Sequence, residues 1–227
     1  MTRTFWFLVP ILMGAAMSAK AQTVLTLSAN GTVRVAPDEV VASFNVQEVQ
    51  PSAAGAQEAL NQAMAKALAA ARSVPNVVII TGGYESYAST PDDHSKRRFT
   101  SQQSLTLIQP VKDGAPGKTF NYLLARLQAD GLMLNGLRGD LSKKRQAAAK
   151  RAAICDALTQ LRVEADGIAD ALHKKVGALK TLNVNTSNGK VPPGPLIIAM
   201  AAAAPGPQSA PGKITITANV SAVFDLE

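Results

Sequence analysis

The clearest pattern in the chain is a strict alternation near its end. From Ile214 to Phe224 every second residue is apolar, and the positions between them hold Thr, Asn, Ser and one Val. A period of two predicts a strand with one buried face, placed well inside a sheet. Less regular apolar segments predict further strands at 23–28, 32–35, 40–47, 77–80, 100–108, 132–141 and 179–184.

Two turn signals lie between the first strands. Asn30-Gly31 predicts a break or bulge between 23–28 and 32–35. Pro37-Asp38 predicts a turn, because proline fixes φ and has no amide hydrogen to donate. The segments on either side of Pro37 are therefore expected to form an opening hairpin.

Helical spacing predicts three helices, each beginning at a capping residue. Ser52 caps the first, an alanine-rich helix that Pro75 ends; Thr119 caps a short second helix that Gly131 stops. Ser142 caps the longest, which is expected to run to about Lys175. Its expected buried stripe is Ala148, Ala152, Cys155, Leu158, Arg162 or Val163, Ala165, Ile168, Ala169 and Leu172.

The resulting order of elements is ββαββαβαββ. Strands paired mainly with sequence neighbours favour an antiparallel sheet, and amphipathic helices then gather on one face. We expect an α+β fold, a mainly antiparallel sheet with helices packed on one face, including one long helix in the C-terminal half.

The first residues are typical of an export signal. A short positive start precedes an apolar run from Phe5 to Met17, and Ala19-x-Ala21 is a small-residue cleavage pattern. We expect residues 1–21 to be removed after Ala21, leaving a domain over 22–227 in a bacterial periplasm. A membrane anchor is disfavoured because the run is shorter than the roughly 20 residues that a span needs.

A long apolar connection covers residues 189–212. It holds six of the 13 prolines, around Leu196-Ile197-Ile198 and four alanines, and cannot be regular helix or central strand throughout. Connections of this length are typically functional or mobile. The polar residues 89–98 are expected to form a second, exposed loop.

These features together resemble the SIMPL-domain family. The segments that carry the resemblance are Gly31-x-Val33-x-Val35-x-Pro37-Asp38, the long helix ending Ala169-x-x-Leu172 before Val176-Gly177, and Pro211-Gly212 before the last strand. The chain departs from the family pattern at Lys174-Lys175 and at Lys213. The resemblance implies an exported periplasmic or envelope protein with no assigned reaction. The relatives it implies include a periplasmic immunogenic protein that assembles into a large ring-like oligomer, and others that are linked to oxidative-stress tolerance.

Composition narrows the classes of function. The chain has 227 residues, is 47% hydrophobic and carries one cysteine, which excludes wholesale disorder and a disulfide scaffold. The formal charge of +7 falls to +5 without the export signal, whose only charged residues are Arg3 and Lys20. Three Asn-x-Ser/Thr sites, at Asn30, Asn185 and Asn219, would accept glycans in a eukaryotic secretory protein; we favour chance occurrence.

The segment Gly114-Ala115-Pro116-Gly117-Lys118-Thr119 has some features of a phosphate-binding loop. Such a loop needs four residues between its glycines, whereas two stand here and one is proline. We therefore interpret this segment as a turn followed by a helix cap, and we expect no cofactor.

The remaining candidates for chemistry are few. Asp92, Asp93 and His94 could offer metal ligands, but Lys96-Arg97-Arg98 follows at once, and His173 is placed in a last helical turn. Cys155 is expected to be a small buried hydrophobe. No Gly-x-Ser-x-Gly motif is present. We expect no catalytic residue, no metal site and no enzyme.

Basic residues crowd the start of the long helix: Lys143, Lys144, Arg145, Lys150 and Arg151. Cations there oppose the helix dipole at a cost of a few tenths of a kcal/mol each. This indicates either a solvated face or contact with an acidic surface, such as another subunit or anionic lipid. Nucleic acid is disfavoured because aromatic residues for base stacking are scarce.

Two functions of different classes stay open. The first is a non-enzymatic envelope protein that works through self-association as a homo-oligomer. The second is a binding module for a small envelope ligand, with residues 191–211 as a lid. A hydrolase is a distant third.

Overall fold

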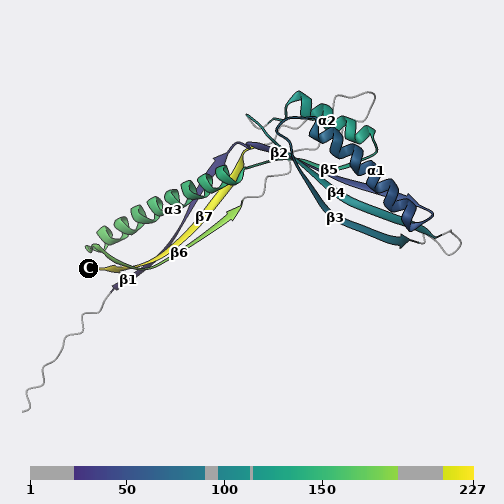
Figure 1. Cartoon of the computed structure of the whole chain (residues 1–227). Coiled ribbons are helices and arrows are strands. Elements are labelled where there is room, and N and C mark those ends of the chain that lie inside the picture. The colour runs from purple at the N-terminus through teal and green to yellow at the C-terminus, as the bar shows by residue number, and fades with distance from the viewer. Residues whose placement is uncertain (1–22, 90–96, 113–114, 189–211) are drawn as a thin grey trace, which may run out of the picture.

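The computed structural model describes residues 23–89, 97–112, 115–188 and 212–227. The chain forms two lobes that meet at a bend (Figure 1). The order predicted from the sequence is confirmed. Its elements are β1 (Thr23–Val35), β2 (Glu39–Gln50), α1 (Ala53–Arg72), β3 (Val78–Ser89), β4 (Arg98–Pro110), α2 (Lys118–Ala129), β5 (Met133–Asp140), α3 (Lys143–Ala171), β6 (Val176–Asn188) and β7 (Ile214–Leu226).

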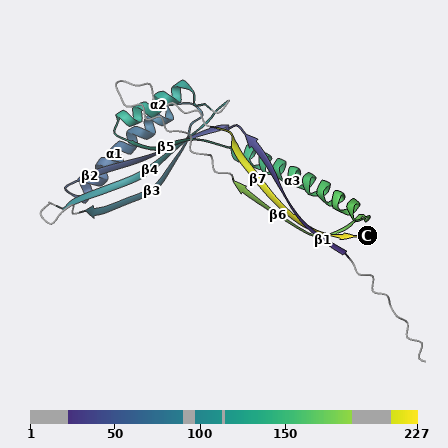
Figure 2. The ribbon, with the colours of Figure 1, turned by 180° about the vertical axis from the view of Figure 1, so that it is seen from behind.

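The first lobe, here called the α3 lobe, is a three-stranded antiparallel sheet under one helix. Its strand order is β1-β7-β6, and α3 lies along it (Figures 1 and 2). The alternating segment forms the middle strand, as predicted, and every second side chain from Ile214 to Leu226 is buried. These side chains meet the small residues of α3 in one hydrophobic core.

Gly31 sets how closely α3 approaches β1. A Cβ at this position would collide with the carbonyl oxygen of Ala153 and the amide nitrogen of Ala157, both backbone atoms of α3. The buried stripe of α3 is itself almost all alanine: Ala149, Ala153, Ala157, Leu161, Ala165 and Ala169. Small side chains on both elements therefore allow helix and strand to pack with their backbones close together.

The second lobe, the α1 lobe, contains the other four strands in the order β3-β4-β2-β5. Helix α1 lies across β2, β3 and β4, and α2 packs beside it (Figure 1). Ser52 caps α1 as predicted, its hydroxyl accepting from the amide of Gly55 at 3.1 Å. The core of this lobe shares no buried residue with the core of the α3 lobe. The expected α+β class, with helices on one face of antiparallel sheets, is confirmed, but the strands form two sheets.

The predicted opening hairpin is wrong. β1 pairs with β7 over its whole length, whereas β2 pairs with β4 and β5 in the other lobe. The predicted break at Asn30-Gly31 is also wrong, because both residues pair in register with β7. Pro37-Asp38 therefore joins two lobes rather than two neighbouring strands.

Three details of the helices differ from the prediction. Thr119 is not a cap: α2 begins at Lys118, and Gly117 occupies the cap position. The buried stripe of α3 is shifted from the predicted one, with only Ala165 and Ala169 in common. Cys155 is consequently exposed, not buried. Ser142 does cap α3, and Gly131 ends α2 with a φ of 93°.

Helix α3 ends four residues earlier than expected. His173 has a φ of 54°, the left-handed conformation typical of the residue after a helix cap. The amide of Lys174 then donates to the carbonyl of Ala169 at 2.8 Å. This closes the helix, and β6 starts at Val176 in place of the predicted Leu179.

Candidate functional site

The structure does not describe several of the residues that the sequence analysis singles out. Asp92, Asp93 and His94 lie outside the described residues, as do Gly114 and residues 189–211. His173 is exposed just beyond the end of α3, not within its last turn. Within the described ranges, no group of three His, Cys, Asp or Glu side chains could hold a metal ion.

The joint between the lobes is built around Asp38. Its carboxylate accepts from the amide of Ser142 at 2.8 Å and from the Ser142 hydroxyl at 2.6 Å. The same hydroxyl oxygen accepts from the amide of Arg145 at 3.2 Å, so one serine both caps α3 and binds the β1–β2 connection. The chain passes between the lobes twice, once in the β1–β2 connection and once in the β5–α3 connection. The hydrogen bonds between Asp38 and Ser142 therefore join the two connections.

Two further carboxylates lie near Asp38, those of Glu39 and Asp140. Partial burial, and the negative charges of Asp38 and Asp140, raise the pKa of Glu39 above its ordinary value of 4.5. The folded protein therefore keeps a proton on Glu39 to a higher pH than the unfolded chain does. We interpret this cluster as part of the joint.

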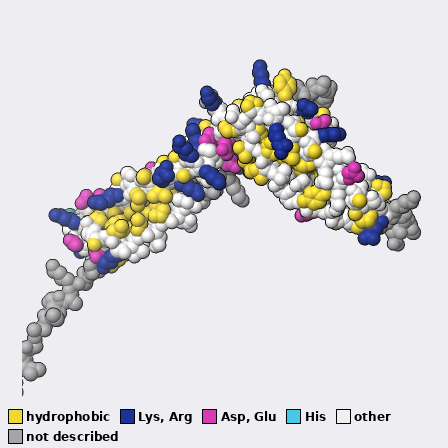
Figure 3. Space-filling model, viewed as in Figure 1, with side chains coloured by type: hydrophobic (Ala, Val, Ile, Leu, Met, Phe, Trp, Pro, Cys, Tyr) yellow, Lys and Arg dark blue, Asp and Glu magenta, His cyan; other side chains and the backbone are white. Residues whose placement is uncertain are grey.

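The basic residues predicted at the start of α3 lie beside this acidic joint. Lys143, Lys144, Arg145 and Arg151 are exposed, and Lys150 is half-buried. The space-filling view shows basic side chains gathered on the α3 lobe next to the acidic ones at the bend (Figure 3). The first turn of α3 contains no acidic residue. We name the three exposed residues Lys143, Lys144 and Arg145 the basic cluster.

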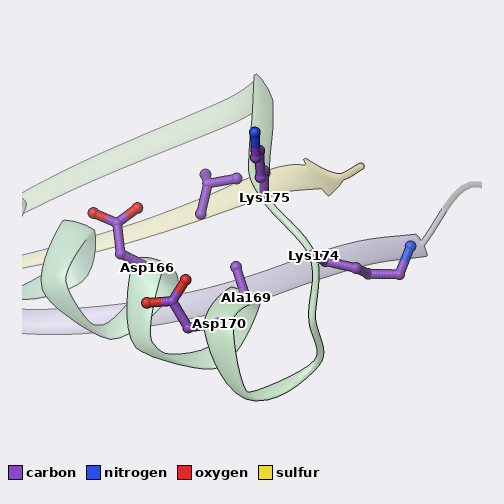
Figure 4. Close-up of a pocket in the computed structure, with 6 residues that line it drawn as sticks. Asp166, Ala169, Asp170, Lys174 and Lys175 are labelled. Carbon is purple, nitrogen blue, oxygen red and sulfur yellow. The ribbon is translucent and has the colours of Figure 1, made fainter.

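A shallow hollow of about 330 Å³ lies at the other end of α3 (Figure 4). Asp166 and Asp170 project from the helix on one side, and Lys174 and Lys175 belong to the connection that follows it. Most of these side chains are exposed and reach water, which weakens any charge-based binding. The hollow lacks the buried polar groups that usually orient a small ligand.

An apolar row on β6 is exposed although it lies on the sheet face that packs against α3. Leu182 pairs with the buried Ala222 of β7, and Val184 with the buried Val220, so these side chains share the sheet face that α3 covers. They are nevertheless 43% and 44% exposed, and Leu179 is 51% exposed. The reason is that α3 lies over β1 and β7, while β6 lies at the far edge of the sheet in both views (Figures 1 and 2). Leu179, Leu182 and Val184 are named the β6 row.

Among the described residues, no strand pairs with the outer edge of β6. Residues 181–187 hold no proline and no charged side chain, and they pair with β7 without a register shift. Irregular pairing is confined to the start of the strand, around Leu179. There Lys180 forms an ion pair with the buried Asp225, their Nζ and Oδ1 atoms 2.7 Å apart. A long, uncharged edge with unpaired backbone groups is a template for a further strand.

This surface was only partly predictable. The sequence indicates a strand at 179–184, and the alternation of Leu182 and Val184 with asparagines indicates that one face is apolar. What it does not indicate is that α3 leaves this face uncovered, because that depends on which strands α3 packs against.

The three Asn-x-Ser/Thr sites fall on the sheet of the α3 lobe. Asn30, Asn219 and Asn185 are aligned across β1, β7 and β6. The side-chain amide of Asn219 donates to the side-chain oxygen of Asn30 at 2.8 Å. These two side chains therefore bind each other across neighbouring strands.

Comparison with known proteins gives the chain a family. Residues 25–224 match SIMPL, described as a protein of unknown function (DUF541). A search of the curated proteins finds none that matches the chain. No helix in the described part of the chain is both long and apolar enough to cross a membrane. The family match begins in β1 and ends in β7, so it includes both lobes and the joint, and the resemblance expected from the sequence is confirmed. The chain belongs to the SIMPL family.

Proposed function

We propose that this protein is exported to the periplasm and acts there without catalysing a reaction, by associating with copies of itself. The observation that carries the proposal is the β6 row, three apolar side chains between 43% and 51% exposed, beside a strand edge that no other described strand pairs with. A second chain that paired with this edge would cover backbone groups and apolar surface together. Burial of the apolar side chains is favourable, and strand pairing would replace the water bound to the backbone groups with hydrogen bonds to the second chain.

The proposed place of action rests on the N-terminal sequence, and the proposed role rests on the family. Residues 1–21 have the pattern of a cleaved export signal. Resemblance to the SIMPL family suggests a role in tolerance of envelope or oxidative stress.

A strain that lacks the gene should survive peroxide less well than its parent. The full chain should restore survival, whereas a chain without residues 2–21 should not. Equal rescue by both chains would contradict an exported role.

The basic cluster supports a contact with an anionic membrane surface. Three adjacent exposed cations attract anionic lipid by about 1 kcal/mol each near the surface. We expect the mature chain to sediment with vesicles containing phosphatidylglycerol, and the K143Q/K144Q variant to bind several-fold more weakly. A matched control is K174Q/K175Q, which removes the lysine pair beyond the other end of α3. Equal loss in both variants would show that net charge, not the basic cluster, governs binding.

The ligand-binding alternative stays a prediction. Its lid, residues 191–211, lies outside the described residues, and the hollow at the end of α3 offers a small ligand few buried partners. Deletion of residues 195–204 would separate the two functions. A deletion that leaves assembly unchanged but alters melting in the presence of envelope extract would favour ligand binding.

A further inference from the structure

We propose that β6 pairs antiparallel with β6 of a second copy, joining two three-stranded sheets into one of six strands about a twofold axis at Asn183. This inference rests on the proposed self-association and names its interface. It follows from three features of the described residues: which edge is open, which apolar row is uncovered, and where the nearest charges lie.

Two of the four edge strands, β6 and β3, expose apolar side chains, those of β3 including Val78, Ile80 and Tyr84. β6 differs from β3 because its pairing beside Leu182 and Val184 is regular. In the α1 lobe, the pairing of β3 shifts between Thr81 and Tyr84, and the pairing of β5 shifts opposite Ser43 and Phe44. Such irregularities discourage a further strand from adding. On β1 the apolar side chains, among them Leu27 and Val33, already pack in the core beneath α3.

The apolar row selects an antiparallel register. A twofold axis at Asn183 places Leu182 of each copy opposite Val184 of the other, so that apolar side chains meet on the helix side of the joined sheet. A one-residue slip would place Leu182 opposite Asn183 or Asn185, on the other face. Moving the axis to Val184 or Asn185 would place Leu182 opposite Thr186 or Asn188 and separate the two apolar pairs.

Charges near the edge agree with this register. Residues 181–187, the part that pairs, are uncharged. Lys180 falls opposite Thr186 of the other copy, so the two Lys180 side chains lie at opposite ends of the interface. Each remains free to keep its ion pair with Asp225. The joined edge therefore creates no like-charge contact, which a symmetric interface otherwise risks.

A cysteine at the axis tests the register directly. In a C155S background, which removes the exposed native thiol, N183C should form a disulfide-linked dimer on mild oxidation, because the two substituted residues face each other. The matched control is C155S/N185C, because Asn185 is also exposed and lies two residues away on the same strand. Its two cysteines would lie about 13 Å apart along the strands, beyond disulfide reach. We expect at least tenfold more linked dimer from N183C. Linkage through N185C as fast as through N183C would overturn the register.

A charged substitution in the β6 row is a second test of the interface. V184K places two lysines diagonally across the axis, and the dimer should weaken at least tenfold by light scattering. V24K is the control, an exposed valine on the opposite edge strand of the same sheet, and it should leave the dimer intact. Circular dichroism and melting check that both variants fold, and the cysteine variants test the interface even where V184K does not.

The outcomes separate the interface from the proposed function. A wild-type protein that assembles while N183C stays unlinked and V184K assembles normally would overturn the β6 interface and leave self-association standing. A wild-type protein that is monomeric at every concentration would overturn both.

Discussion

Replacing Gly31 with alanine is expected to destabilise the α3 lobe by about 3 kcal/mol, near the upper end of the usual cost of overpacking. The added Cβ would meet the backbone of α3 at Ala153 and Ala157, and a backbone atom cannot rotate away as a flexible side chain can. The helix must then move off β1, and its alanine stripe would lose contact with the sheet along its length. Urea unfolding followed by circular dichroism measures the change.

Gly167 supplies the matched control in the same lobe. It lies within α3, and nothing stands within 4 Å of the position that a Cβ would take. G167A should therefore stabilise the protein by about 0.5–1 kcal/mol, the ordinary gain for Gly to Ala inside a helix. The two substitutions add the same methyl group and should change the free energy of unfolding in opposite directions. A G31A protein within 0.5 kcal/mol of wild type would show that α3 does not need its close approach to β1.

Local features of the fold could be predicted from the sequence. The strict alternation at 214–224 identifies β7 as a central strand, and Ser52 and Ser142 mark the starts of two helices. Gly131 marks the end of α2. In each case the signal and its consequence lie within a few residues of each other, so no knowledge of distant contacts is needed.

Pairing between distant segments could not be predicted in the same way. The turn at Pro37-Asp38 exists, but a turn does not determine whether the strands on its two sides bond to each other. Thr23 pairs with Leu226, at the opposite end of the chain. That choice is made by the complementary apolar faces of β1 and β7 beneath α3, which only the folded arrangement brings together.

The stripe on α3 shows a second limit. Alanines stand at Ala148 and Ala152 and also at Ala149 and Ala153, so hydrophobic spacing fits two faces of the helix equally well. The structure buries Ala149 and Ala153, and Cys155 turns outward as a consequence. The exposure of the β6 row has a different cause, because it depends on α3 packing against β1 and β7 and not against β6.

Self-association is the central claim, and it should depend little on salt. The proposed interface is made of backbone hydrogen bonds and apolar side chains, whereas contacts through the basic cluster would be screened over about 8–10 Å at physiological ionic strength. A twofold interface at β6 also requires that the smallest assembly hold two chains. Larger species are expected to hold even numbers of chains.

The most direct measurement is multi-angle light scattering of the mature chain, residues 22–227, after size-exclusion chromatography at several micromolar concentrations, each in low and high salt. The expected result is a species of two chains or an even multiple of two, with the same mass in both salt conditions. A mass of one chain at every concentration would contradict the account.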